Sequence, residues 1–258
     1  MQPATNKSLG QHWLNDEASL EAMLAAADIG PNDTVLEIGP GPGALTAKLV
    51  KQARQVVAVE FDEILARQLP QRMQASNLQV VHQDILTFDL TALPQGYKVA
   101  ANIPYYLTSN LLRVLCESPN PFSKAALLIQ KEVAQRVCAL PGGMSLLSVS
   151  VQFYCEPSLG PVVPARLFTP PPKVDSQILA LTYRTQPLFA GTDTKQFFRI
   201  VKAGFAQRRK TILNSLSAGM HLGRDETTHW LGQANIAPTA RPQELSLQQW
   251  HELYIHKV

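Results

Sequence analysis

The chain is poor in cysteine, and its histidines are not spaced as metal ligands. Only 3 cysteines occur among 258 residues, namely Cys116, Cys138 and Cys155, an odd number at wide spacing. Such a set fits reduced, buried thiols better than a disulfide framework or a zinc site. The two histidines of the C-terminal segment HELYIH are five positions apart and would not share one helix face. We therefore expect no metal ion.

Long apolar runs are also lacking. No segment approaches the roughly 18 apolar residues of a membrane-spanning helix, and the N-terminal stretch MQPATNKSLG has no apolar core of a secretory signal. Hydrophobic residues make up 45% and charged residues 17% of the chain, which argues against disordered, collagen-like and coiled-coil proteins. We expect a folded cytoplasmic protein without membrane segments.

Charge is small overall but unevenly distributed along the chain. The formal net charge is +3, yet residues 1–159 carry 11 Lys and Arg against 14 Asp and Glu, whereas residues 160–258 carry 12 against 6. A basic C-terminal part suits a polyanionic partner, although a solvated basic surface would give the same counts. The asymmetry suggests two functional zones.

Apolar segments alternate with helix-compatible segments over the first half of the chain. The strand-like segments are TVLEIG, QVVAVE, LQVVHQD, YKVAAN and KAALLIQ, and the helix-like ones are SLEAMLAAADI, ALTAKLVKQA and EILARQLPQRM. This alternation predicts an α/β fold with a doubly wound, Rossmann-like parallel sheet covered on both faces. In such sheets, ligands bind at the carboxyl ends of the strands.

The pattern changes after about residue 140. The segments LLSVSVQFY, LGPVV and ILALTY could be further strands or a helix, and the three prolines in RLFTPPPKVDS require a loop. From Asp193 onward the periodicity is helical. We therefore predict a first domain over residues 1–188, with residues 1–16 as a lid segment. A small all-helical C-terminal domain would follow over residues 189–258.

Polar or glycine residues stand where three of the predicted strands end. The first strand is followed by GPGPG, the second ends in Glu60, 21 residues after Gly39, and the third ends in Asp84. Glycines let the backbone approach a ligand, Glu60 could accept hydrogen bonds from a ribose diol, and Asp84 with Ile85 could receive an adenine. Both a nicotinamide dinucleotide and S-adenosylmethionine fit this pattern. Because the two prolines of GPGPG remove N–H donors that a pyrophosphate needs, S-adenosylmethionine fits better.

The fourth strand runs into NIPYY, a motif suited to an adenine. The N6 amine of adenine is a weak nucleophile, and an enzyme can assist it by accepting hydrogen bonds from the amine as charge develops. The Asn102 side-chain oxygen and the Ile103 carbonyl could accept these bonds. Pro104 would fix the turn, and the Tyr105 ring could stack on an extruded base. The alternative is that NIPYY is only a strand end with a proline turn, whose tyrosines pack at the rim of the sheet.

In their order along the chain, these motifs resemble those of a known family. EIGPGPG, VEFD, QDI and NIPYY, with KSLGQHWLND before them and FTPPPKVDS and FAQRRKTILNSL after them, look like the ribosomal RNA adenine N6,N6-dimethyltransferases of the KsgA type. The resemblance spans nearly the whole chain. It implies S-adenosylmethionine as methyl donor. As substrate it implies two adjacent adenosines in a hairpin loop near the 3′ end of 16S rRNA, within an assembling small ribosomal subunit.

The resemblance also implies roles for individual residues. Cofactor contacts are expected from Gln11, His12, Leu14, Gly39, Gly41, Glu60, Asp84, Ile85 and Asn102. The catalytic set is Asn102, Pro104 and Tyr105, which would meet the target adenine. Phe168 would be a second aromatic residue near the base. The chain departs from the family at GQHWL, where GQNFL is usual, so the contact of His12 with the cofactor is left open.

A basic stripe is predicted in the C-terminal helices. If one helix runs unbroken from Thr194 through Gly204 and beyond, 100° per residue places five basic residues within a sector of about 100°. They are Lys195, Arg199, Lys202, Arg209 and Lys210. Such a stripe suits an RNA backbone, although a solvated helix face is the simpler alternative. Arg208 would point to the apolar side and serve as a structural ion-pairing residue.

The leading hypothesis is an enzyme, an S-adenosylmethionine-dependent rRNA adenine dimethyltransferase that acts as a monomer on the small subunit. The antibiotic-resistance branch of the same chemistry, which methylates a large-subunit adenosine, is the nearest alternative. Two further alternatives are an NAD-dependent oxidoreductase and a protein that binds rRNA or assists assembly without catalysis. FTPPPKVDS and FAQRRKTILNSL favour the small-subunit enzyme, and the oxidoreductase leaves NIPYY unexplained.

Overall fold

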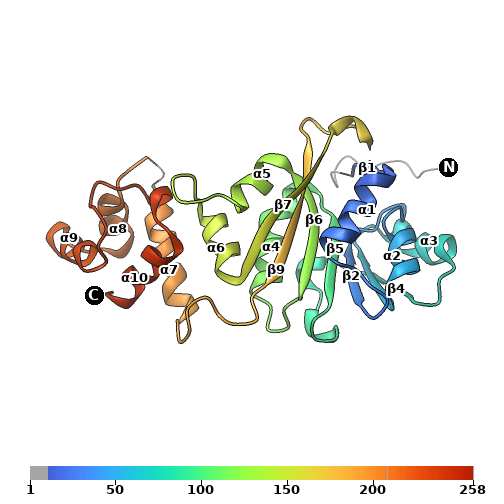
Figure 1. The fold of residues 1–258 in the computed structure, drawn as a ribbon, viewed down its shortest axis with the longest axis horizontal. Coiled ribbons are helices and arrows are strands. Elements are labelled where there is room, and N and C mark those ends of the chain that lie inside the picture. Colours follow the sequence, from blue (N-terminus) through green and yellow to red (C-terminus); the bar gives the residue numbers. More distant parts are fainter. Residues whose placement is uncertain (1–10, 208, 258) are drawn as a thin grey trace. The chain divides into compact units, whose positions relative to one another are not determined.

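The computed structural model describes residues 11–207 and 209–257. These residues form two compact units. The first comprises the described residues up to Ala134 together with Cys155–Tyr183, and the second comprises Gln135–Tyr154 and the described residues from Arg184 onward. Figure 1 gives the course of the chain. Arg208 and the first ten residues of the predicted lid lie outside the described residues.

The described part of the first unit contains a seven-stranded sheet with the order β4-β3-β2-β5-β6-β9-β7. The strands are β2 (Thr34–Ile38), β3 (Gln55–Glu60), β4 (Leu78–His82), β5 (Lys98–Asn102), β6 (Lys124–Gln130), β7 (Cys155–Val163) and β9 (Ser176–Tyr183). The first five strands in this order, from β4 through β3, β2 and β5 to β6, pair in parallel, whereas β9 is antiparallel to both β6 and β7. All five strands predicted for the first half are present, and the doubly wound α/β fold is confirmed.

Helices and short turns precede or connect the strands of this unit. They are α1 (Glu17–Ala26), α2 (Thr46–Gln52), α3 (Glu63–Met73) and α4 (Thr108–Cys116), with short 3-10 turns η2 (Ile85–Thr87), η3 (Leu90–Ala92), η4 (Tyr105–Leu107) and η5 (Ala165–Leu167). Helices α1 and α3 begin after Asp16 and Asp62, whose carboxylates accept hydrogen bonds from N–H groups of the first turn. Asp62 follows the last residue of β3 by two positions, so this cap fixes a short connection at the end of that strand.

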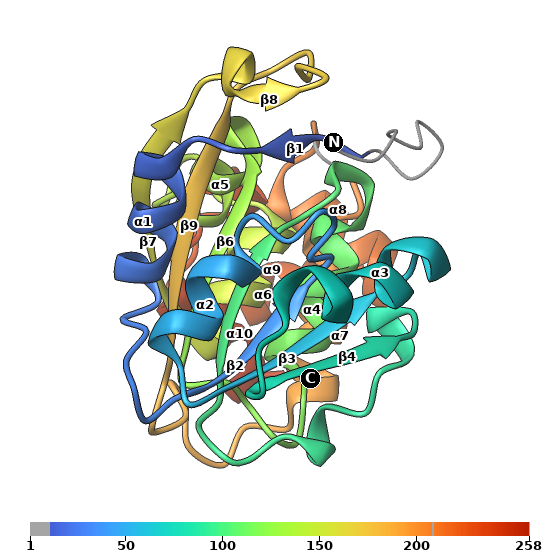
Figure 2. The same cartoon turned by 90° about the vertical axis from the view of Figure 1, so that its right-hand side faces the viewer.

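Side chains on both faces of the sheet are buried. Val35 of β2 and Val56 of β3 pack with side chains of α1 and α2 in one core cluster. Leu36 and Val57, the next residues along the two strands, are also buried and point to the opposite face. Figure 2, viewed from the side of β4, shows α1 and α2 lying against the strands. Burial on both faces explains why the strands are almost continuously apolar.

The segments that the pattern left open divide into one helix and two strands. LLSVSVQFY forms α6 (Leu146–Tyr154), whereas LGPVV lies in β7 and ILALTY lies in β9. The proline-rich segment is preceded by β8 (Phe168–Thr169), which pairs antiparallel with β1 (Trp13–Leu14). The N-terminal segment is thereby attached to the loop that carries Phe168.

The described part of the second unit is helical. It contains α6, α7 (Thr194–Phe205), α8 (Ile212–Met220), α9 (Arg224–Gln233), α10 (Leu247–Ile255) and η6 (Pro242–Glu244), and α5 (Lys131–Val137) runs into it from the first unit. Its core includes the fully buried side chains of Phe197, Trp230 and Trp250. Compared with the predicted C-terminal domain, this unit begins at Arg184 rather than residue 189 and also includes Gln135–Tyr154.

The helix predicted from Thr194 through Gly204 is present as α7, but the prediction that one basic stripe continues along it to Lys210 is wrong. Helix α7 ends at Phe205, and Arg209 and Lys210 lie in the turn that precedes α8. The break lets α8 fold back, so that Ile212 lies close to Gly204 of α7 and is fully buried. A single extended helix would have left the apolar side chains of its second half without this partner.

Gly204 and Gly232 both lie in helices of the second unit, but their surroundings differ. A Cβ at Gly204 would lie 2.4 Å from the Trp250 ring, whereas nothing lies within 4 Å of a Cβ at Gly232. We expect Gly204→Ala to lower the free energy of unfolding by about 1–3 kcal/mol because the site is overpacked. Gly232→Ala should raise it by about 0.5–1 kcal/mol because alanine favours helix. Denaturant unfolding measures both changes, and a stabilised Gly204→Ala variant would contradict the packing argument.

Candidate active site

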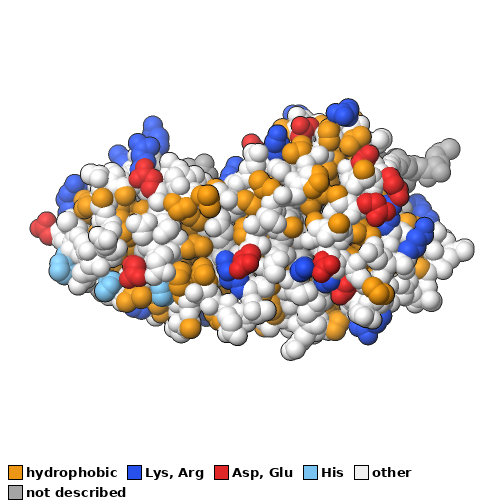
Figure 3. Space-filling model, in the orientation of Figure 1, with side chains coloured by type: hydrophobic (Ala, Val, Ile, Leu, Met, Phe, Trp, Pro, Cys, Tyr) orange, Lys and Arg blue, Asp and Glu red, His pale blue; other side chains and the backbone are white. Residues whose placement is uncertain are grey.

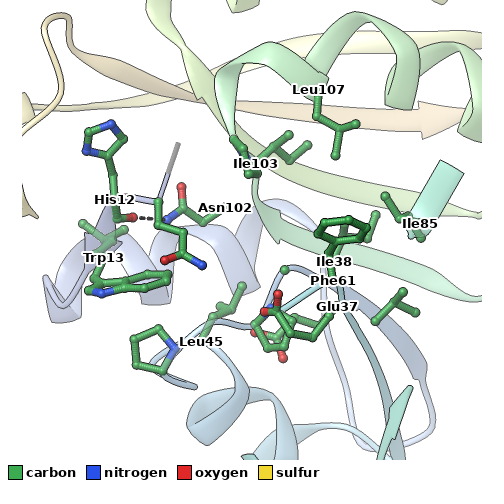
Figure 4. Close-up of a pocket in the computed structure, with 18 of the residues that line it drawn as sticks. His12, Trp13, Glu37, Ile38, Leu45, Phe61, Ile85, Asn102, Ile103 and Leu107 are labelled. Atoms are coloured by element: carbon green, nitrogen blue, oxygen red, sulfur yellow. Dashed lines mark hydrogen bonds between the residues drawn. The ribbon is translucent and has the colours of Figure 1, made fainter. Parts of the chain in front are cut away.

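A cavity of about 320 Å³ opens at the carboxyl ends of the parallel strands. Figure 4 shows residues from the N-terminal segment and from the ends of several strands pointing toward it. The predicted site residues that line it are Gln11, His12, Leu14, Gly39, Glu60, Asp84, Ile85, Asn102, Pro104, Tyr105 and Phe168. Parallel pairing brings these strand ends to one edge of the sheet, which is why residues far apart in the chain meet there.

Gly39 and Gly41 shape the loop between β2 and α2. Their φ angles are 64° and 57°, a region that favours glycine. A Cβ at Gly39 would meet nothing within 4 Å, whereas a Cβ at Gly41 would lie 2.6 Å from the Trp13 ring. Open space therefore lies above Gly39. Gly41 lies against the Trp13 ring instead and is not among the residues that line the cavity, so its contact with the cofactor stays a prediction.

Glu60 ends β3 with its carboxylate held by backbone groups. Oε2 accepts a hydrogen bond from the Gly41 N–H at 3.0 Å, and Oε1 accepts one from the Asp62 N–H at 2.9 Å. Burial raises the pKa of this carboxyl above its ordinary value. Each oxygen has a second lone pair, so the group can also accept hydrogen bonds from a ligand in the cavity.

The turn after β4 brings Asp84 and Ile85 to the same cavity. Asp84 precedes η2, and its Oδ1 accepts a hydrogen bond from the Leu86 N–H at 2.9 Å. This bond fixes the side chain at the edge of the cavity and uses one of its two oxygens. Ile85 is buried and contributes an apolar wall.

Asn102 ends β5 with its amide held in one orientation. Its Nδ2 donates a hydrogen bond to the His12 carbonyl at 3.0 Å, the dashed line in Figure 4. Because a carbonyl can only accept, the nitrogen must face His12, and the amide oxygen remains an acceptor. The next residue, Ile103, donates its N–H to the Leu128 carbonyl at 3.1 Å, which holds the turn against β6.

Tyr105 is fixed at its hydroxyl and lies in the wall of the cavity. The hydroxyl oxygens of Tyr105 and Ser176 are 3.0 Å apart. Partial burial raises the pKa of the phenol, so the ring stays neutral at ordinary pH. Pro104 precedes it at the start of η4. Phe168 is buried and lines the same cavity, so the two predicted base-stacking rings come to one site from distant parts of the chain.

Comparison with known proteins assigns the chain to a family. Residues 3–257 match the family model described as "Ribosomal RNA adenine dimethylase". The chain belongs to this family. The ribosomal RNA small subunit methyltransferase A of Dehalococcoides mccartyi is 42% identical over 251 residues, which cover 96% of this chain and 86% of the relative. The protein of the same name from Streptococcus equi subsp. zooepidemicus is 41% identical over 262 residues, covering 96% and 90%.

Solved structures are similar over nearly the full length of this dimethylase. The 23S rRNA methyltransferase ErmE matches with a TM-score of 0.77 and 30% identity over 95% of this chain and 98% of its own. A dimethyladenosine transferase from Plasmodium falciparum matches with a TM-score of 0.80 and 26% identity, covering 95% and 96%. The predicted enzyme class, an S-adenosylmethionine-dependent rRNA adenine dimethyltransferase, is confirmed. The oxidoreductase alternative has no support from these findings.

Glu37 was not among the predicted site residues of the dimethylase, yet it lines the cavity. It is the fourth residue of β2 and only 1% exposed, and its Oε2 has no hydrogen-bond partner among the described residues. Burial, and then the nearby Glu60 carboxylate, raise its pKa to about 8. A carboxylate inside an otherwise apolar strand, just before a glycine loop, was the available signal. Trp13 and Phe61 also line the cavity without having been assigned a role.

The predicted RNA-binding residues of the dimethylase lie in its second unit. Lys195, Arg199 and Lys202 are exposed along α7, where spacings of four and three residues place them on one face. Arg209 and Lys210 are exposed in the turn after this helix. The five side chains therefore form two groups rather than a single stripe.

Three further expectations concern thiols, metals and membranes. Cys116 and Cys155 are buried with their sulfur atoms 3.8 Å apart, Cys138 is partly buried, and all three are free thiols. Among the described residues, no cluster of His, Cys, Asp and Glu side chains could hold a metal ion. Within the same residues, no helix has both the length and the apolar character needed to cross a membrane.

Glu37 should make stability depend on pH. A glutamic acid in the unfolded chain titrates near 4.5, whereas the pKa of Glu37 in the folded protein is about 8. The folded state then holds an extra proton between these values, so the stabilisation from the protonated carboxyl is full below about pH 4.5 and is lost as pH rises through about 8. Glu37→Gln keeps the shape and does not titrate. Its stability relative to wild type should rise by several kcal/mol, to order of magnitude, over this window.

Urea unfolding at a series of pH values without ligand measures this difference. Glu132 is exposed on α5, so Glu132→Gln serves as the control for removal of a carboxylate and should follow wild type. Parallel pH profiles for wild type and Glu37→Gln would show that Glu37 does not carry the extra proton.

Proposed function

We propose that the enzyme uses this cavity to methylate the N6 amines of two adjacent adenosines near the 3′ end of small-subunit rRNA. The observation that carries the proposal is the orientation of Asn102. Its amide nitrogen is committed to the His12 carbonyl, so its oxygen is left to accept a hydrogen bond. An acceptor of this kind at the edge of a glycine-lined cavity suits an amine that gains positive charge as it reacts.

The residues present fit S-adenosylmethionine, which supplies an electrophilic methyl group when bound. The open space above Gly39 allows close approach to the backbone, as a nucleoside ligand requires. Glu60 would receive the ribose hydroxyls, and Asp84 with Ile85 would receive the adenine ring. The unpartnered oxygen of Glu37 adds a buried acid that favours a positively charged ligand.

The Asn102 oxygen and the Ile103 carbonyl would accept the two hydrogens of the target amine. As a methyl group passed from the sulfonium sulfur of the donor to this nitrogen, the carbon–sulfur bond would break, the nitrogen would become positive and its hydrogens would become stronger donors. The two acceptors would therefore stabilise the transition state more than the ground state. The excess proton then leaves to solvent. Tyr105 and Phe168 would hold the extruded base by stacking, which contributes on the order of 1–3 kcal/mol per base.

The small-subunit substrate follows from the sequence relatives. Those about 40% identical over 96% of this chain are named small-subunit methyltransferases, whereas ErmE, named for 23S rRNA, is 30% identical. We infer that the enzyme acts on an assembling small subunit in the cytoplasm, as a monomer. The predicted C-terminal domain, residues 189–258, would bind rRNA through the exposed basic residues of α7 and of the turn that follows it.

Purified enzyme should transfer methyl groups to isolated small subunits and not to large ones, with the products mapped by mass spectrometry. Asn102→Ala should reduce the methyl-transfer rate by about 10²–10³-fold, as loss of an oriented acceptor does, while much of the rRNA affinity remains. Asn110, exposed on α4, provides a matched Asn110→Ala control that should react at the wild-type rate.

Methylation of the large subunit instead would show that the enzyme has the activity of the antibiotic-resistance branch. Near-normal turnover of Asn102→Ala on the small subunit would agree with the proposed substrate but would contradict the proposed role of Asn102.

Salt dependence tests the rRNA contacts of the second unit. Replacing Lys195, Arg199 and Lys202 together with Gln should weaken rRNA binding and flatten its salt dependence by about 0.7 in log–log slope for each lost phosphate contact. Arg209→Gln with Lys210→Gln should act in the same direction. Arg67→Gln with Arg72→Gln removes exposed charge from α3 and is the control. A slope that falls equally in the control would mean that only net charge matters.

A further inference from the structure

His12 contacts the two segments that would enclose the target base. Its carbonyl accepts the hydrogen bond from Asn102, and its ring lies against the Tyr105 ring with centroids 6.0 Å apart and planes 26° apart. Its Nδ1 lies 2.7 Å from the Pro170 carbonyl, one residue beyond β8. One residue of the N-terminal segment therefore touches the catalytic turn and the loop that carries Phe168.

The bond to Pro170 continues a strand pairing that the backbone alone cannot extend. In the β1–β8 pair, Trp13 lies opposite Thr169 and Leu14 opposite Phe168. His12 and Pro170 come next in this register, and proline has no N–H to donate to its partner. The imidazole instead donates to the Pro170 carbonyl. This contact holds the end of β1 to β8 at the position where backbone pairing stops.

The hydrogen bond also settles which ring nitrogen carries hydrogen. Because the Pro170 carbonyl can only accept, Nδ1 must donate.

Tyr105 is consequently fixed at two points. Its hydroxyl is paired with Ser176, and one side of its ring is packed against His12. A ring that serves as a stacking platform loses function when it tilts, because the base and its amine tilt with it. In Figure 4 the His12 ring lies on the side of Asn102 away from Glu37 and points away from that acid. The contacts of the ring are with Tyr105, a predicted base-stacking residue, and with Pro170.

We propose that His12 is a positioning residue for the adenine pocket, which sets the Tyr105 ring and the loop at residues 168–170 to receive the base. This role rests on the proposed function of the cavity. This role is separate from the cofactor contact that the family resemblance implied for His12, which also lines the cavity, and the affinity for S-adenosylmethionine distinguishes the two roles.

Three substitutions separate the two contacts of the ring. In His12→Asn, Nδ2 of the new side chain can occupy the place of Nδ1 and donate to Pro170, but the aromatic face is lost. His12→Phe keeps the face and loses the donor. His12→Ala loses both, and thermal unfolding establishes that each variant is folded.

Single-turnover methyl transfer at saturating S-adenosylmethionine is the main measurement. We expect His12→Ala to react about 10–100-fold more slowly than wild type, as misplacement of a reacting group does, with His12→Asn and His12→Phe each recovering part of the loss. The dissociation constant for S-adenosylmethionine should stay within about threefold of wild type. A ¹⁵N NMR spectrum of the wild-type protein should show His12 protonated at Nδ1.

Three outcomes would overturn the proposal. They are an unchanged rate in His12→Ala, an affinity for S-adenosylmethionine that falls as far as the rate, or no recovery in either partial variant. Failure of the proposed function itself is distinguishable, because wild type would then not methylate small subunits at all.

Discussion

The hydrogen bond between the Asn102 amide and the His12 carbonyl orders the whole site. An asparagine side chain offers one donor group and one acceptor, so committing the nitrogen determines what the oxygen does. The partner is a backbone carbonyl of a segment that pairs with β8, and this pairing is fixed by Leu14 opposite Phe168. The Asn102 oxygen, which we propose as the acceptor for the target amine, is thus oriented by a contact between residues 90 positions apart. Without the N-terminal segment, the amide at the end of β5 would be free to rotate.

Two buried acids, Glu37 and Glu60, line the cavity and would favour a positively charged ligand. Glu60 has backbone N–H donors on both oxygens, whereas Glu37 has an oxygen without a partner and a pKa raised to about 8. A cationic ligand would favour ionisation of Glu37 beside Glu60, whereas a pyrophosphate would oppose it. This electrostatic argument supports a sulfonium nucleoside over a dinucleotide independently of the prolines in the glycine loop.

Local pattern predicted the parallel strands because each is a short apolar run that ends at a glycine or a polar residue, as TVLEI does before Gly39. It was ambiguous for Leu146–Tyr154, where an apolar run fits a strand or a buried helix equally well. It also missed the end of α7 at Phe205, since the amphipathic pattern continues into α8. That break depends on α8 packing back against α7, a contact that periodicity along one chain does not contain.

The sequence by itself determined the fold class, the strand ends and many, but not all, of the residues that line the cavity, since parallel strands bring their carboxyl ends together wherever they form. Only the tertiary structure decided how those residues are engaged. Gly41 is covered by Trp13 and supports Glu60, and the His12 ring packs on Tyr105 and bonds to Pro170. Burial and hydrogen-bond partners depend on what the rest of the chain brings near a side chain, and residue type and spacing do not specify that.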